Sequence, residues 1–119
     1  MNTPQIAARL VELCRNGQFE TAQQELFADD VISIEPYVMP GFEKETKGLE
    51  ANMAKARKFD SMLEATHSIK VSEPLVTGHV IAFTLEMDVT MKGQERSSFN
   101  ELCVYHVKDG KVISEQFFM

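Results

Sequence analysis

Two hydrophobic periodicities divide the chain near residue 62. Before that point, apolar residues recur every three or four positions, which is typical of amphipathic helices. After it, apolar and polar residues alternate with a period of two, which is typical of half-buried strands. Helices followed by a run of strands predict an α+β domain in which the helices cover one face of a curved antiparallel sheet.

The first part of the chain predicts two short helices and a strand. Thr3 can cap the first helix, and Asn16-Gly17 can stop it. A second helix is expected over residues 18–27. Asp29-Asp30 then forms the turn into a short apolar strand, which ends at Glu35-Pro36.

A loop and a third helix complete the helical part. Residues 36–46 form a loop with two prolines and exposed apolar side chains, including Tyr37. Apolar residues in a surface loop suggest a lid or rim over a pocket. Thr46 can cap the third helix, which is expected to end near Phe59.

The second part of the chain predicts four strands separated by turn signals. The strand over 63–71 places His67 among its apolar residues, and the strand over 80–91 shows the clearest alternation. Strands over about 96–107 and 112–118 follow, and glycine-containing turns separate them.

The last hairpin leaves two registers open at Asp109-Gly110. A two-residue turn would put Glu101 and Glu115 on opposite faces of the sheet. A three-residue loop with Gly110 as a bulge would pair Val107 with Lys111 and put both carboxylates on one face. A slip of one residue turns over every side chain of a strand, so the register decides which carboxylates meet.

Length and charge limit the classes of function. The chain has 119 residues, 44% of them hydrophobic, which predicts a single domain over 1–119 with its own core. The net charge of −6 disfavours nucleic acid as a partner, and Lys55, Arg57 and Lys58 are interpreted as a solvated helix face.

Targeting signals and cysteines indicate a cytoplasmic setting. No apolar run is long enough to cross a membrane, and no signal peptide is apparent at the first residues. Cys14 and Cys103 fall within a helical and a strand pattern, so both are expected to be buried, reduced thiols.

Two runs of the sequence resemble the nuclear transport factor 2-like superfamily. They are Phe27 to Pro36 (FADDVISIEP) and Val104 to Phe118 (VYHVKDGKVISEQFF). Their order and spacing extend the resemblance over nearly the whole chain, which is most similar to the SnoaL-like proteins, including polyketide cyclases. The resemblance implies a cone-shaped α+β barrel with a deep apolar cavity and a homodimer formed through the outer sheet face. Residues expected on that face are Val80, Ala82, Thr84, Leu102, Val104 and His106.

Comparison with ketosteroid isomerases, which share this scaffold, refines the expectation. Their general base precedes a proline at the end of the first strand, the place that Glu35 occupies here. Their two oxyanion donors correspond approximately to Val11 and Cys103, neither of which is a useful donor. The chain is therefore not expected to be a ketosteroid isomerase. The same comparison favours the register that puts Glu101 and Glu115 inside the cone.

The candidate chemistry is acid–base catalysis without a cofactor or metal. Glu35 is the candidate base, with Glu115 or Glu101 as the acid, because burial and mutual repulsion keep a carboxyl group protonated near neutral pH. His67 or Tyr105 could orient these groups. Structural interpretations remain open beside this one: a buried polar cluster for the glutamates, and a satisfied core histidine for His67.

The expected function is conversion of a small apolar, carbonyl-containing or cyclic molecule by isomerisation, cyclisation, dehydration or hydrolysis. The alternatives are a non-catalytic small-molecule-binding dimer and a protein-interaction scaffold. Residues expected to contact the ligand are Leu10, Leu13, Tyr37, Met53, Phe83, Leu85, Met87, Phe99, Cys103, Tyr105 and Phe117.

Overall fold

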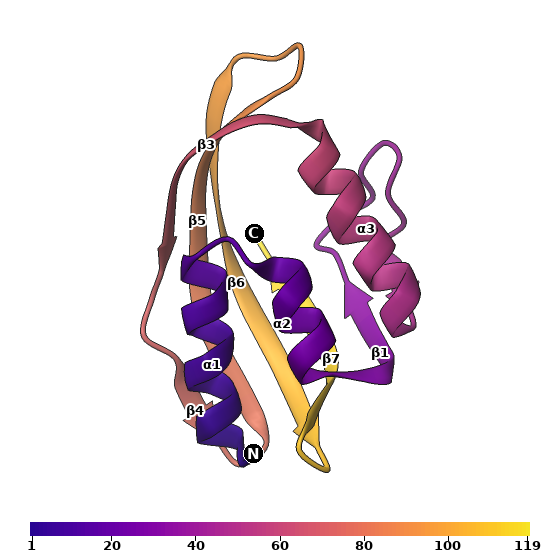
Figure 1. Cartoon of the computed structure of the whole chain (residues 1–119), viewed down its shortest axis with the longest axis vertical. Helices are drawn as coiled ribbons and strands as arrows, with labels where there is room; N and C mark the ends of the chain where they lie inside the picture. The colour runs from indigo at the N-terminus through magenta and orange to yellow at the C-terminus, as the bar shows by residue number, and fades with distance from the viewer.

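A curved seven-stranded sheet with three helices on one of its faces makes up the structure, a computed structural model that describes residues 1–119 (Figure 1). The elements in chain order are α1 (Thr3–Arg15), α2 (Phe19–Leu26), β1 (Phe27–Ile34), β2 (Glu45–Lys47), α3 (Leu49–Met62), β3 (Leu63–Val71), β4 (Leu75–Thr77), β5 (Val80–Met91), β6 (Arg96–Lys108) and β7 (Lys111–Phe118). None of the helices has the length and apolarity needed to cross a membrane.

The strand order explains how distant segments come together. The sheet runs β2-β1-β7-β6-β5-β3, and β4 pairs with the start of β5. The β1–β7 pair is parallel, whereas all other pairs are antiparallel. The predicted α+β class is therefore confirmed, but the sheet is mixed and stays open instead of closing into a barrel.

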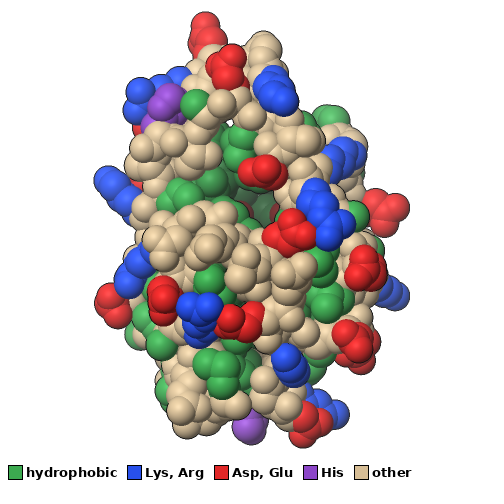
Figure 2. Space-filling view, in the orientation of Figure 1, with side chains coloured by type: hydrophobic (Ala, Val, Ile, Leu, Met, Phe, Trp, Pro, Cys, Tyr) green, Lys and Arg blue, Asp and Glu red, His purple; other side chains and the backbone are tan.

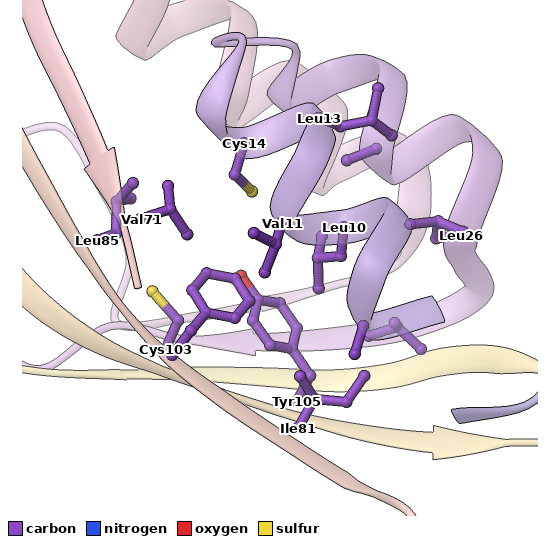
Figure 3. Packing of buried hydrophobic residues seen from close by; sticks show 14 of the residues in the cluster. Leu10, Val11, Leu13, Cys14, Leu26, Val71, Ile81, Leu85, Cys103 and Tyr105 are labelled. Carbon is purple, nitrogen blue, oxygen red and sulfur yellow. The ribbon is translucent and has the colours of Figure 1, made fainter. Parts of the chain in front are cut away.

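Alternation along β5 builds the core as predicted. Its inward residues, from Ile81 to Val89, are buried at every second position. The apolar face of α1 covers them, and Figure 3 shows Leu10 and Val11 close to Tyr105 and Ile81. This packing places α1 against β3, β4 and β5 in the lower half of Figure 1, and the turn between β5 and β6 extends beyond it at the top.

Both expected threonine caps are wrong. Asn2 caps α1 by accepting a hydrogen bond from the backbone N–H of Gln5, whose side chain accepts one from the Asn2 N–H in return. Gly48 precedes α3 with a φ of 94°, and Thr46 lies in β2 instead. The chain therefore gains a short edge strand where the sequence predicts only loop.

Strand β1 begins earlier than expected. It extends from Phe27, and Asp29 and Asp30 lie exposed within it instead of forming a turn before it. The pairing with β7 shifts between Phe27 and Ile32, so the two aspartates occupy an irregular stretch of the strand. The strand ends before Glu35-Pro36, as predicted.

Two register shifts in β3, between Leu63 and Ala65 and between Thr66 and Ser68, move His67 away from the core. Thr66 pairs with Val89 and Ser68 with Asp88, which leaves His67 as an extra residue between the two pairs. The His67 ring is exposed, and its Nε2 lies 2.8 Å from Thr90 Oγ1 on the outer face. The prediction that His67 lies on the apolar face is therefore wrong.

The last hairpin combines features of both predicted registers. Asp109 and Gly110 have φ values of 52° and 76° and form a two-residue turn, so Val107 pairs with Val112. A bulge at Ile113 then shifts the pairing by one residue. The predicted bulge at Gly110 is wrong in position, but Glu101 and Glu115 still share the inner face.

Candidate functional site

Three glutamates and one lysine form a polar cluster at the inner face of the sheet. Glu35 follows the end of β1, Glu101 lies on β6 and Glu115 lies on β7. Lys55 reaches the cluster from α3 and forms an ion pair with Glu35, with 3.0 Å between Nζ and Oε1. The parallel pairing of β1 with β7 brings Glu35 beside the C-terminal strand although 80 residues separate it from Glu115 (115 − 35).

Neighbouring strands fix the position of Glu115. It pairs with Ser33 of β1 on one side and with Tyr105 of β6 on the other, so the three side chains lie in one row. Glu115 is only 6% exposed, and its carboxyl group has no hydrogen-bond partner within the protein. A buried carboxyl group without a donor is costly in its ionised form, so protonation is favoured.

Lys55 ties α3 to the sheet. Its Nζ donates one hydrogen bond to Ser33 Oγ and one to Glu35 Oε1, both at 3.0 Å. The Lys55 and Glu35 side chains are only 17% and 19% exposed. The interaction is therefore a partly buried, charge-assisted pair, stronger than a surface salt bridge.

Burial sets the protonation of the other two carboxyl groups. It raises the pKa of Glu101 to about 7, with the charge of Glu35 adding to the rise and Lys55 opposing it. It raises the pKa of Glu115 to about 8, which Lys55 again opposes while Glu35 and Glu101 raise it. Near neutral pH Glu115 is therefore mostly protonated and Glu101 about half protonated, beside the ion pair of Lys55 with Glu35.

The cysteines are free and buried, as predicted. Burial raises the pKa of the Cys14 thiol to about 12 and that of Cys103 further, and the nearby glutamates add to both shifts. Figure 3 shows both thiols in the packed space between α1 and the sheet. Because the thiolate is the reactive form, neither cysteine is a nucleophile here.

A cavity of about 520 Å³ opens between the α1–α2 turn, the C-terminal half of α3 and strand β3. Phe19, Phe59 and Ile69 are among its apolar lining residues, and Arg57 and Glu20 bridge α3 and α2 at 2.6 Å beside it. Figure 2 shows a hollow with an apolar interior and acidic side chains near its rim. Its volume suits a small ligand.

The predicted ligand contacts are distributed among several environments. Met87 is the only one that borders this cavity. Residues packed in or against the hydrophobic core are Leu10, Leu13, Phe83, Leu85, Phe99, Cys103, Tyr105 and Phe117, and Met53 is also buried. Tyr37 is 51% exposed, and its hydroxyl lies 3.6 Å from Met119 Sδ. Tyr37 therefore lies outside the cluster.

Some residues that line the cavity are neighbours of the cluster residues. Met87 pairs with Phe99 of β6, and Glu101 is the next inward-facing residue along that strand. Ala56 of the lining directly precedes Arg57 and follows Lys55 in α3. The cluster is thus next to the cavity along β6 and α3, but none of its four side chains lines it.

Lys55 is the site residue that the sequence interpretation missed. A lysine between Ala54 and Arg57 resembles a solvated helix face, but Asn52, Lys55 and Phe59 recur at helical spacing. Asn52 is fully buried and Phe59 packs against the core, which turns Lys55 inward. This spacing was the available signal.

A metal site does not fit the cluster. No group of three or more histidine, cysteine, aspartate or glutamate side chains is arranged to hold a metal ion. The Lys55 ammonium already binds Glu35 and lowers the pKa of both neighbouring acids, and a second cation there would be repelled.

Comparisons with known proteins identify the fold and family. The sequence model of the SnoaL-like domain matches residues 1–119. A crystal structure of a proposed SnoaL-like polyketide cyclase from Mesorhizobium loti is 32% identical, covers 100% of both chains and has a TM-score of 0.90. A Xanthomonas campestris protein of unknown function with a cystatin-like fold is 21% identical over 99% of this chain and 90% of that one, with a TM-score of 0.83. No curated protein matches the chain.

Proposed function

The chain belongs to the SnoaL-like domain family, and we propose that it is a cofactor-independent acid–base enzyme acting on a small apolar molecule that contains a carbonyl group or a ring. Isomerisation, cyclisation, dehydration and hydrolysis fall within this class. The similarity to a proposed polyketide cyclase from Mesorhizobium loti supports ring-forming chemistry on such a molecule.

One observation carries the proposal. Glu35 is held by a cation, whereas Glu101 and Glu115 beside it have pKa values raised to about 7 and about 8 by burial. Carboxyl groups pushed toward different protonation states at one pH can serve as a base and an acid. A cluster kept only for stability gains nothing from a buried carboxyl group without a hydrogen-bond partner, such as that of Glu115.

The roles follow from this arrangement. Glu35 removes a proton from a carbon beside the carbonyl group, and the electrons of the broken C–H bond move to the carbonyl oxygen. Glu101 or Glu115, in its protonated form, donates to that oxygen as negative charge develops. The proton held by Glu35 is then delivered to another carbon or leaves with a departing hydroxyl group as water.

Exchange of substrate hydrogen for deuterium tests the proposal. Compounds that raise the melting temperature in a screen of apolar carbonyl and polyketide-like molecules would be incubated with the protein in deuterated water, and NMR would record loss of the C–H signal. Glu35→Gln is expected to slow exchange by about 10²–10⁴-fold, the usual contribution of a general base. Glu64→Gln, at an exposed position of β3, is the matched control. Unchanged exchange in Glu35→Gln would exclude Glu35 as the base.

The second candidate function is a non-catalytic dimer that binds a small molecule or another protein. The outer face of the sheet favours a dimer, whether or not the protein is an enzyme. Leu75, Leu102 and Phe118 are 76%, 41% and 46% exposed. Leu75 lies across from Ala82, and Leu102 pairs with Phe118. This half-apolar surface suits a second copy of the chain in the cytoplasm, where the two free thiols would stay reduced.

A further inference from the structure

We infer that Lys55 stabilises the negatively charged oxygen of the reacting substrate, and that the substrate is a neutral carbonyl compound that becomes an oxyanion only during the reaction. The inference rests on the proposed function and adds the electrophilic residue and the charge of the substrate. Four observations support it: the free hydrogen-bonding capacity of Lys55, its access to a ligand, the absence of competing cations, and the charge balance of the cluster.

Lys55 has an unused hydrogen-bond donor. An ammonium group carries three N–H donors. Two of them bind Ser33 Oγ and Glu35 Oε1, and no protein atom accepts from the third. The two bonds fix the position of Nζ, so the remaining donor is oriented before a ligand arrives.

A ligand can reach this donor. The Lys55 side chain retains 17% of its exposure and borders a second, more open cavity of about 350 Å³, together with Phe42 and Ala51. Ala56, the next residue of α3, lines the larger cavity. Lys55 therefore lies where α3 separates the two spaces, beside the buried carboxyl groups.

The other lysine of the second cavity, Lys58, donates to the carbonyl oxygen of Gly41 instead. Lys55 is the only positively charged side chain that acts on the pKa of Glu101 and Glu115. Val11 and Cys103 line the core beneath α1 and are an apolar residue and a weak donor, respectively. Tyr105 is confined between Phe83, at 5.4 Å between ring centroids, and Phe27, at 6.3 Å. A charged donor therefore has to come from α3.

The charge of the cluster selects a neutral substrate. When Glu101 and Glu115 are protonated, the charges of Lys55 and Glu35 cancel. A substrate that already carries a negative charge would add an uncompensated charge to this partly buried place. A neutral carbonyl compound that gives its proton to Glu35 leaves the sum unchanged, because the new oxyanion takes over the partnership with Lys55.

Ionisation of a bound phenol tests the inference without requiring turnover. The probe is 4-nitrophenol, a neutral compound whose phenolate absorbs visible light. Its spectrum would be recorded with and without saturating protein at one pH below the pKa of the free phenol. Wild-type protein is expected to increase the phenolate fraction. Lys55→Met should lower the ionisation constant of the bound phenol by at least about tenfold, the smaller effect expected for a hydrogen bond to a charged group.

Matched variants separate this role from a structural one. Lys70→Met removes an exposed lysine of β3 that borders neither cavity, and it should leave the spectrum unchanged. Lys55→Arg should retain part of the ionisation, which controls for misfolding of Lys55→Met. Glu35→Gln should increase the phenolate fraction, because a competing negative charge beside Lys55 is lost, although the same variant is expected to slow deuterium exchange.

The possible outcomes are distinct. Failure of wild-type protein to bind or ionise the phenol, or equal ionisation by Lys55→Met, overturns the inference. Ionisation of the phenol that depends on Lys55 supports the inference. If Lys55 ionises the phenol but no substrate exchanges deuterium, only the proposed function fails. Deuterium exchange combined with Lys55-independent ionisation leaves the proposed function standing and removes Lys55 from the oxyanion site.

Discussion

Replacing Glu115 by glutamine should change how the stability of the protein depends on pH. In the folded protein, burial raises the pKa of Glu115 to about 8 from the ordinary value of 4.5. The folded state therefore holds a proton between about pH 4.5 and pH 8 that the unfolded chain has released. Stability must fall as pH rises through this window, because deprotonation favours unfolding.

The size of this fall in stability follows from the difference in bound protons between the folded and unfolded states. One proton bound only by the folded state gives a slope of about 1.4 kcal/mol per pH unit. Between pH 5 and pH 7, Glu115 alone should cost the wild-type protein on the order of 2–3 kcal/mol, a large part of a typical stability of about 5–15 kcal/mol. Glu101, whose pKa is raised to about 7, should add a similar slope below pH 7.

Urea denaturation at several pH values between 5 and 8 measures the effect. Glu115→Gln keeps the shape of a protonated carboxyl group but cannot ionise, so its free energy of unfolding should fall less steeply with pH than that of wild type. The two proteins should have similar stability near pH 5, and the variant should be the more stable near pH 8. Glu64→Gln, which alters an exposed carboxylate on β3, should follow the wild-type curve.

Two results would refute this reasoning. Wild-type stability that stays constant or rises between pH 5 and pH 8 would mean that Glu115 ionises without cost, for example through a hydrogen-bond donor. An identical slope in Glu115→Gln would mean that other groups cause the dependence. Either result would also weaken the case for a protonated acid beside Glu35.

Two further predictions concern the scaffold. Asn52→Ala should lower the free energy of unfolding by about 1–3 kcal/mol in urea denaturation, because the buried Asn52 amide donates to the carbonyl oxygens of Thr46 and Gly48, at 3.2 and 2.8 Å. Both oxygens would lose this donor, and that of Gly48 would keep only the backbone N–H of residue 52. A cost below the error of the measurement would contradict this. Leu102→Glu should convert the proposed dimer to a monomer in analytical ultracentrifugation, because it places a charge on the outer face of the sheet. Lys108→Glu, at an exposed position near the end of the same strand, should leave the dimer intact. A wild-type protein that sediments as a monomer would remove the dimer proposal.

Strand positions were predictable because burial on one face imposes a period of two. The span of β5 follows directly from this alternation, and Glu35-Pro36 correctly marked the end of β1. The parallel β1–β7 pairing was not predictable from periodicity, because a strand pattern does not name its neighbour.

The errors at His67 and Ile113 share a physical cause. A bulge inserts one unpaired residue and reverses the alternation beyond it, and no composition signal marked either place. His67 therefore left the candidate site, whereas Glu115 entered it despite a misplaced bulge. The prediction of the first helix cap was wrong for a local reason: Asn2 caps the helix together with Gln5, in place of the neighbouring Thr3.

The sequence predicted only some of the residues of the candidate site. The three glutamates stood out as charges within apolar strands, but Lys55 belongs to a residue type that usually points into water. The helical spacing of Asn52, Lys55 and Phe59 was the sequence signal for its inward direction, and the burial of Asn52 shows which way that face of α3 turns. Whether the predicted contacts hold a ligand stays a prediction.

The bulge at Ile113 has a consequence for how this chain can change over evolutionary time. Because this one unpaired residue sets which way Glu115 points, deletion of a single residue between the turn and Glu115 would carry the carboxyl group through the sheet to its outer surface. Length between Gly110 and Glu115 should therefore be under stricter selection than the identity of the residues that provide it.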